Sequence, residues 1–138
     1  VHSGTYNNNV LTMAAGIAGL TKVFTPDVVN KLNQSGDELR ARLQGIADQH
    51  DAPFQIMGRG SMICIHPQRQ PISNPGHTKA SSAGARKLFH LEMHMRGCYI
   101  SRRGFMSLCL PLTAADHDKF ADSFESVALE YGEVLEKQ

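Results

Sequence analysis

Four stretches of the chain place apolar residues three or four positions apart, the spacing of an amphipathic helix. They cover about residues 9–22, 25–50, 82–96 and 113–135. Thr25–Asp27 combines a cap, a first-turn proline and an early acid, and Thr113–Asp116 is a capping box with Asp in place of Glu. Asn8 or Asn9 can cap the first helix, and Gly97 fits a left-handed end of the third. The pattern therefore predicts four helices.

Short apolar runs bounded by glycine or proline lie between these helices. Four of them are predicted strands: Phe54–Met57, Ser61–His66, Cys98–Ser101 and Phe105–Leu110. Arg102-Arg103-Gly104 separates the last two runs in a hairpin-like arrangement. Helices and strands in this order predict an α+β fold, a small and largely antiparallel sheet covered by helices.

Two segments interrupt this pattern. Gly36 lies inside the second helix, where it lowers helix propensity by about 1 kcal/mol without breaking the apolar period. Pro67 to Ser81 holds three prolines and few apolar residues, so we predict a long exposed loop, the most mobile part of the chain.

Composition narrows the class of protein. The 138 residues suffice for a domain with its own core, and the net charge of +1 gives no sign of a nucleic-acid or membrane-surface partner. No run approaches the roughly 18 apolar residues of a membrane span. The three cysteines, Cys64, Cys98 and Cys109, lie among apolar residues without CxxC spacing. We expect buried free thiols and a reducing, cytoplasmic setting.

Two motifs with a possible chemical role have simpler interpretations. His90 and His94 share one helix face, but Glu92 lies neither directly after the first nor directly before the second, as a zinc-protease motif requires. We favour a solvated or half-buried helix face. Gly58–Ser61 is glycine-rich but leads into a strand, so it lacks the helix start of a phosphate loop and indicates a tight turn.

Two other short motifs fit anions. Gly4 and Thr5 precede the Asn-rich helix start, where close backbone amides, a hydroxyl and the helix dipole favour an anion; a simple cap is the alternative. Arg102 and Arg103 lie at a strand connection, where a guanidinium can hold a carboxylate with two hydrogen bonds. Solvated turn residues are the alternative there.

These motifs follow an order that resembles the closing part of class III pyridoxal-phosphate-dependent aminotransferases. The segments that carry the resemblance are His2–Gly16, Phe24–Pro26, Leu39–Leu43, Gly58–Met62, Phe89–Leu91, Arg96-Gly97, Ser101–Leu108 and Leu110–Thr113. Together they run the whole length of the chain except the Pro67 to Ser81 loop. The resemblance implies the type I fold of these enzymes, with residues 23–138 as its C-terminal small domain. Residues 1–22 are then the phosphate-contact loop and first helix, at the edge of a large domain.

The resemblance also implies a site. Such enzymes are homodimers with active sites at the subunit interface, where Gly4 and Thr5 would touch the phosphate of pyridoxal 5'-phosphate. Arg103 resembles the active-site arginine of β-phenylalanine aminotransferases and would face the substrate carboxylate, with Arg102 beside it. The family's cofactor-bearing lysine lies upstream of the Gly-Thr motif, and none of the six lysines here matches it. We therefore expect a C-terminal fragment without a catalytic residue, inactive alone, whose intact form moves an amino group on a carboxylate-bearing substrate.

Within the family, the closing motifs resemble glutamate-1-semialdehyde 2,1-aminomutases and β-amino-acid aminotransferases. Ornithine and GABA transaminases carry an arginine in the final strand that Phe105–Leu110 lacks. Aminomutase and transaminase both stay open, with an amino acid or an amino aldehyde as substrate. The alternative is a non-catalytic α+β binding or regulatory module. The opening at Gly4–Asn9 favours the enzyme fragment, because a free-standing module has no need to begin inside a phosphate-contact loop.

Overall fold

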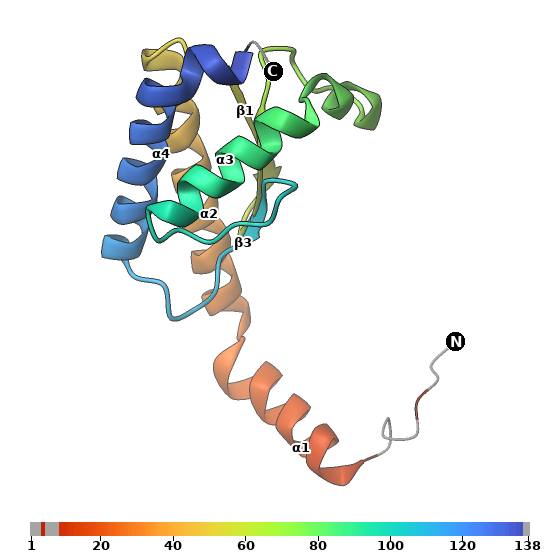
Figure 1. The fold of residues 1–138 in the computed structure, drawn as a ribbon. Coiled ribbons are helices and arrows are strands. Elements are labelled where there is room, and N and C mark those ends of the chain that lie inside the picture. Colours follow the sequence, from red (N-terminus) through yellow and green to blue (C-terminus); the bar gives the residue numbers. More distant parts are fainter. Residues whose placement is uncertain (1–3, 5–8, 137–138) are drawn as a thin grey trace. The chain divides into compact units, whose positions relative to one another are not determined.

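The computed structural model describes Gly4 and residues 9–136. It divides into two compact units, residues 1–31 and 32–138, and each is considered by itself. The boundary predicted at residue 22 separates parts of two family domains and stays a prediction. Figure 1 gives the order of the elements along the chain.

The first unit holds helix α1 (Val10–Ala18) and a π-helical turn η1 (Gly19–Val23). Asn9 caps α1, since its Oδ1 accepts hydrogen bonds from Leu11 N at 2.9 Å and Thr12 N at 3.2 Å. The predicted helix over residues 9–22 is confirmed, with Asn9 as the cap. None of the residues of α1 or η1 is buried.

Helix α2 (Pro26–Gln49) begins in the first unit and continues into the second. Thr25 O accepts a hydrogen bond from Val29 N at 2.9 Å, as the predicted helix start requires. Further along, Leu39, Leu43 and Ala47 form the buried stripe that faces the core. Gly36 is buried on the same side.

The sheet of the second unit has the antiparallel order β1-β2-β3. Its strands are β1 (Phe54–Arg59), β2 (Met62–Pro67) and β3 (Phe105–Ser107). Met57 pairs with Cys64, and Ile63 pairs with Met106. The fold class, helices with a small antiparallel sheet, is as predicted.

The strand predicted over Cys98–Ser101 is wrong: the structure has no strand in this described segment. Two of its backbone groups bond to α3 (Ala83–Met95): Cys98 N donates to Met93 O at 2.9 Å, and the His90 ring bonds to Ile100 O at 2.9 Å. Ser101 bonds instead to the residues that follow, since it donates to Phe105 O at 3.3 Å and accepts from Gly104 N at 2.9 Å. Cys98 and Ile100 are buried while Tyr99 is exposed. Burial therefore alternates as it does in a strand, although the segment is not paired with a neighbouring strand. The last predicted strand is also shorter than expected and ends at Ser107.

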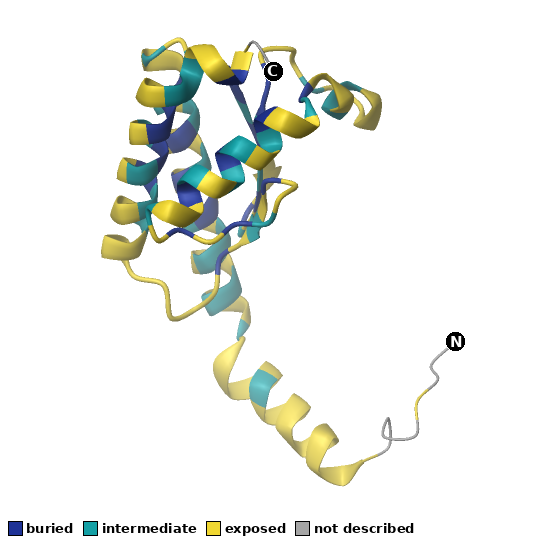
Figure 2. Ribbon diagram, viewed as in Figure 1, coloured by how far each residue is buried: buried dark blue, intermediate teal, exposed yellow. Residues whose placement is uncertain are grey.

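Helices α3 and α4 (Ala114–Glu136) complete the second unit. Ser82 caps α3, with Ala85 N donating to its Oγ at 2.9 Å. Phe54, Phe89 and Phe124 meet at the centre, with ring centroids 4.9 to 6.1 Å apart. Figure 2 shows the buried residues gathered between α2, α3, α4 and the sheet. Burial of such aromatic side chains is the main stabilising term of this core.

The predicted exposed loop from Pro67 to Ser81 is ordered in part. It contains a short 3-10 helix, η2 (Pro75–Ala80), and Gln68 and Ser81 are buried. The Gln68 amide donates to Gln70 O at 2.8 Å and His77 O at 3.1 Å, and its Oε1 accepts from Ser81 N at 3.0 Å. The hydrogen bonds of the buried Gln68 side chain thus hold together a segment that has few apolar residues to pack.

The cysteines differ from one another. Cys98 is buried and Cys64 is half-buried, but Cys109 is exposed, so burial was wrongly predicted for it. All three are free thiols. Among the described residues, none of the helices is long and apolar enough to cross a membrane.

Candidate functional site

A tight turn fixes the position of Arg103. Gly104 N donates to Ser101 O at 2.9 Å, and Phe105 N donates to Ser101 Oγ at 3.1 Å. Gly104 has φ +77°, and a Cβ there would lie 1.9 Å from Ile65 O. Its own carbonyl accepts from Ile65 N at 2.9 Å. The turn is therefore held against β2 by a glycine that no other residue can replace without strain.

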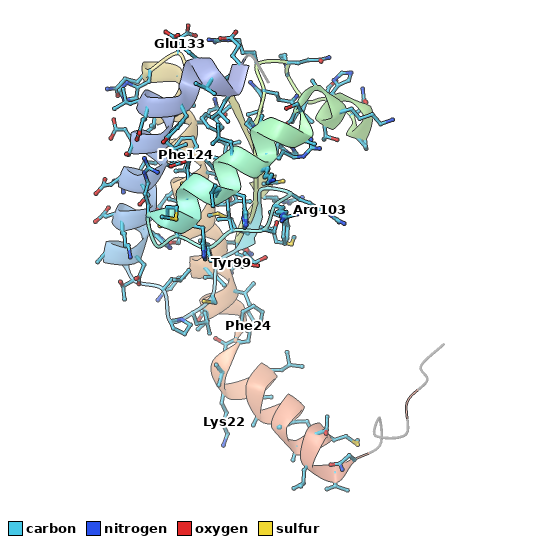
Figure 3. All side chains as sticks on the ribbon, viewed as in Figure 1. Lys22, Phe24, Tyr99, Arg103, Phe124 and Glu133 are labelled. Atoms are coloured by element: carbon cyan, nitrogen blue, oxygen red, sulfur yellow. The ribbon has the colours of Figure 1, made fainter. Side chains whose placement is uncertain are left out.

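Cys64 adds a further contact to the same turn. Its thiol donates to Arg103 O at 3.4 Å. Burial raises the pKa of Cys64, which keeps the thiol protonated and able to donate near neutral pH. The backbone of Arg103 is thus held while its side chain stays exposed, beside β3 (Figure 3).

Arg103 lines a cavity of about 490 Å³ in the second unit. Three elements contribute to it: β2, η2 with the residue after it, and the first turn of α3. The lining residues are His66, Thr78, Lys79, Ser81, Ser82, Ala83, Arg86 and Arg103. Polar and basic groups dominate this list, so the cavity suits a charged ligand better than an apolar one.

The cavity is cationic. Lys79, Arg86 and Arg103 line it, with His66 as a fourth basic residue, and none of the described lining residues is acidic. Elsewhere Arg40, Arg42, Arg69 and Arg96 form salt bridges with acids. No salt bridge within the described part of the chain involves Arg86 or Arg103. Two guanidinium groups in one cavity without a carboxylate favour an anionic ligand.

His66 is the histidine of the cavity wall. Its partial burial lowers its pKa below the usual 6.5, and the nearby positive charge of Arg86 lowers it further. The imidazole is therefore mostly neutral at neutral pH. It can donate or accept a hydrogen bond there without adding a full charge.

The structure brings only part of the predicted site together. Arg103 lines the cavity, whereas Arg102 is exposed and does not. Gly4 belongs to the first unit, is exposed, and has φ +153°, a conformation that favours glycine. Thr5 lies outside the described residues. The Asn9 side chain already accepts from the amides of Leu11 and Thr12, so these two donors of the helix start are not left for an anion.

Sequence reasoning missed Lys79, Ser81 and Arg86. One signal was present: the first turn of α3 holds no acid, and Arg86 follows it immediately. A cation near a helix N-terminus opposes the helix dipole. That unfavourable placement is a reason to look for an anion nearby.

The histidine pair of α3 has a structural role. The rings of His90 and His94 stack with centroids 6.2 Å apart, and Tyr99 packs edge-on against both. His90 Nδ1 lies 2.9 Å from Ile100 O, a bond that ties the segment after α3 to the helix. No cluster of three possible metal ligands occurs in the described part of the chain.

Comparison with known proteins identifies the class. The family model described as aminotransferase class-III matches residues 1–127. The β-phenylalanine transaminase of Variovorax paradoxus is 39% identical over 134 residues, which are 97% of this chain and 31% of that protein. Glutamate-1-semialdehyde 2,1-aminomutase 1 of Bacillus cereus is 30% identical over 84% of this chain and 27% of that protein. The chain belongs to the class-III aminotransferase family.

A solved structure agrees with this assignment. The crystal structure of a β-phenylalanine aminotransferase from Variovorax paradoxus superposes with a TM-score of 0.91 at 38% sequence identity. The match covers 99% of this chain and 32% of that one. The chain therefore has the fold of the C-terminal part of these enzymes and spans about a third of the length of the relatives it matches. A solved transaminase with pyridoxal phosphate bound has the same fold, with a TM-score of 0.75 at 24% sequence identity.

Proposed function

We propose that this chain is the C-terminal part of a pyridoxal-phosphate-dependent enzyme that moves an amino group on a carboxylate-bearing substrate, and that Arg103 holds the substrate carboxylate. The observation that carries the proposal is the place of Arg103. Its guanidinium lines an acid-free, cationic cavity and has no salt-bridge partner among the described residues. A planar guanidinium binds a carboxylate through two parallel hydrogen bonds, which fixes the orientation of the substrate as well as its position.

The neighbouring groups strengthen this role. Lys79 and Arg86 add positive charge to the same cavity. Their field attracts an acid before it is bound, and the cavity walls limit the screening of that attraction by water. His66, mostly neutral at physiological pH, supplies a hydrogen bond at little electrostatic cost.

The cofactor phosphate would contact the other part of the predicted site, Gly4 and Thr5. The exposed backbone of Gly4 fits a close approach by a phosphate oxygen. Asn9 occupies two amides of the α1 start, so the fit is that of a secondary contact and not of a whole phosphate site. When bound, pyridoxal phosphate supplies the electron sink for the reaction. We place the lysine that carries it, and the groups around its ring, outside this chain.

Among the activities of the family we favour a transaminase acting on a β-amino acid. The relative named β-phenylalanine transaminase is 39% identical to this chain and the aminomutase 30%. The motif of Arg103 also resembles that of β-phenylalanine aminotransferases. As in the family, we propose a homodimer. The class-III match speaks against the alternative, a non-catalytic binding or regulatory module.

The test uses the longer enzyme that contains this chain. Arg103→Gln should raise the apparent KM for a β-amino acid at least about tenfold, because charge-assisted hydrogen bonds contribute about 1.5–3 kcal/mol each. An amine substrate without a carboxylate should lose little. Absorbance of the bound cofactor should stay unchanged, because Arg103 holds the acid and not the phosphate.

Two variants act as controls. Arg102→Gln should have a smaller effect, since Arg102 does not line the cavity, and the exposed Arg59 of β1 should have none when changed to Gln. A large effect of Arg102→Gln with none for Arg103→Gln would show that the turn has been assigned in the wrong register. If neither mattered, the carboxylate would be held by residues outside this chain, and the role of Arg103 would be rejected.

A further inference from the structure

The cavity extends beyond Arg103 to the first turn of α3, where its groups can bind an acid of their own as well as attract one toward Arg103. Arg86 is the principal one. Its Nη1 donates to Ser81 O, but it forms no salt bridge within the described residues. A guanidinium has five N–H groups, so most of its donors are left for a ligand.

Ser81 is the second group. It is only 2% exposed, and its backbone is fully used: its N–H donates to Gln68 Oε1 and its carbonyl accepts from Arg86. Its hydroxyl Oγ is buried and has no hydrogen-bond partner in the described structure. Buried hydroxyls nearly always have a partner. Since Ser81 lies in the cavity wall, a ligand in the cavity is the partner that the site offers.

The start of α3 supplies two further donors. The Ser82 side chain accepts from Ala85 N, and Ser82 O accepts from Arg86 N at 3.2 Å. The amides of Ala83 and Gly84 belong to the first turn, which has no acceptor within a helix. They lie at the positive end of a 13-residue helix.

We propose that Arg86, Ser81 and the first turn of α3 form a second oxyanion subsite, which holds a second carboxylate of a substrate whose first carboxylate is held by Arg103. The enzyme would then act on at least one compound with two acid groups, as amino donor or acceptor. That substrate class rests on the proposed function. The binding of an acid at the subsite does not, because it needs neither the cofactor nor turnover.

The experiment uses the 138-residue chain, labelled with ¹⁵N, and follows amide resonances during titration at 0.15 M salt. Glutarate carries two carboxylates and butyrate one, on chains of similar length. We expect glutarate to bind at least about tenfold more tightly than butyrate, as expected for one added charge-assisted contact. Glutarate should shift the Ala83 and Gly84 amides, whereas butyrate should not.

Variants then test whether the subsite causes the preference. Arg86→Gln should abolish the preference for glutarate and weaken butyrate binding much less, because butyrate loses only the attraction of a neighbouring charge. Arg59→Gln removes an exposed arginine outside the cavity and should change neither affinity, which controls for the greater net charge of glutarate. Ser81→Ala, which leaves the bonded backbone groups in place, should weaken glutarate binding in the same direction if Arg86→Gln fails to fold.

Several results would overturn the proposal. One is equal affinity of the wild-type chain for glutarate and butyrate, or no saturable shift at Ala83 and Gly84. Another is an equal loss of glutarate binding in Arg86→Gln and Arg59→Gln, which would indicate unspecific attraction. Inorganic phosphate that shifts these amides while glutarate shows no preference would mark a phosphate site instead. If the longer enzyme transferred no amino group while the chain still gave the expected titrations, the proposed function would be rejected and the subsite would stand.

Discussion

The contact between α2 and the turn that joins β1 to β2 depends on a single glycine, Gly36. A Cβ on Gly36 would lie 2.1 Å from Gly60 O, in the turn between β1 and β2. The same turn is bonded to α2 through Asp37 and Asn33, which accept from Gly60 N at 3.0 Å and Ser61 N at 3.1 Å. The hairpin can approach the helix this closely only because Gly36 has no side chain.

Gly36→Ala should therefore destabilise the fold, although alanine is the better helix former. A forced backbone shift of this kind costs about 1–3 kcal/mol, more than the gain of up to about 1 kcal/mol in helix propensity. Gly45 is the matched control, since it lies in the same helix with open space around its Cα. Gly45→Ala should raise the free energy of unfolding, measured in urea. Equal effects of both substitutions would show that the hairpin does not press on α2.

The sequence predicted Gly36 only as a weak point of the helix. Spacing and propensity describe the helix itself, and Gly60 lies 24 positions further along the chain. What makes Gly36 necessary is a contact between two elements, and no local pattern shows it. Arg103 is a different case, because its motif resembles that of the family's active-site arginine and so predicts its role. The same motif does not predict that Arg86 and Lys79 line the cavity with it.

At the scale of the element, helix ends were the features most readily predicted. In the capping box of α4, Thr113 N donates to Asp116 Oδ2 at 2.8 Å and Asp116 N donates to Thr113 Oγ1 at 3.4 Å. These bonds join residues three positions apart, so their pattern is complete in the sequence. The bonds from the Thr113 backbone and side chain, in that order, lower the pKa of Asp116 below its usual 3.8.

This shift predicts a pH dependence of stability. A carboxyl whose pKa is lower in the folded state stabilises the fold above its unfolded pKa, and this contribution is lost as the pH falls through the folded value. The capping box should therefore weaken at pH values below about 3.8. Asp116→Asn cannot titrate, and its unfolding free energy should fall less than that of wild type between pH 5 and roughly pH 3. Parallel pH profiles would show that the Asp116 charge contributes nothing to α4.

The predicted strand at Cys98–Ser101 is wrong because a strand depends on a partner segment, whereas a capping box is complete within a few residues. Alternating burial of Cys98, Tyr99 and Ile100 has the period of a strand, but a strand is defined by its hydrogen-bonded neighbour. The chain leaves α3 through Gly97 at φ +76°, and the next backbone groups bond back to that helix. Pairing between distant segments cannot be read from the alternation alone, whereas the order β1-β2 follows from a short turn.

At the scale of the molecule, the two units differ in what they bury. The second unit holds the whole core, around Phe54, Phe89 and Phe124. In the first unit α1 has no buried residue, and Val10 and Leu11 are more than three quarters exposed, at 77% and 79%. Most helix stability in proteins comes from packing of an apolar face, and no residue of α1 is buried in the described structure.

Amide hydrogen exchange of the isolated chain should reveal this difference. Amides of Val10–Ala18 should exchange orders of magnitude faster than those of Leu39 to Ala47, because opening α1 exposes no buried surface. The measurement is a time course of deuterium uptake resolved by residue. Equal protection of both segments would mean that the apolar face of α1 is covered in solution, and dilution would then tell whether a second copy covers it.

The last prediction concerns chemistry by the chain alone. The isolated chain should transfer no amino group, and pyridoxal phosphate should attach to no particular lysine. We expect this because, by the resemblance to the family, the cofactor lysine lies upstream of the Gly-Thr motif and is none of the six lysines here. Lys79 lies in the cationic cavity, which attracts the anionic cofactor, but its side chain is exposed, and no neighbour among the described residues holds it in one geometry. Positioning of the reacting groups supplies much of the rate of such a reaction, and an unheld lysine does not provide it.

Borohydride reduction followed by peptide mass mapping measures the attachment. We expect weak labelling spread over several lysines and rising with cofactor concentration without saturation. A matched pair of variants, Lys79→Arg and Lys87→Arg, should each lower the total label slightly, since each removes one reactive amine while keeping the charge. Saturable labelling that Lys79→Arg abolishes and Lys87→Arg leaves intact would contradict the prediction. The cationic cavity would then hold the cofactor itself, and the roles assigned to Arg103 and Arg86 would have to pass from the substrate carboxylates to the cofactor phosphate.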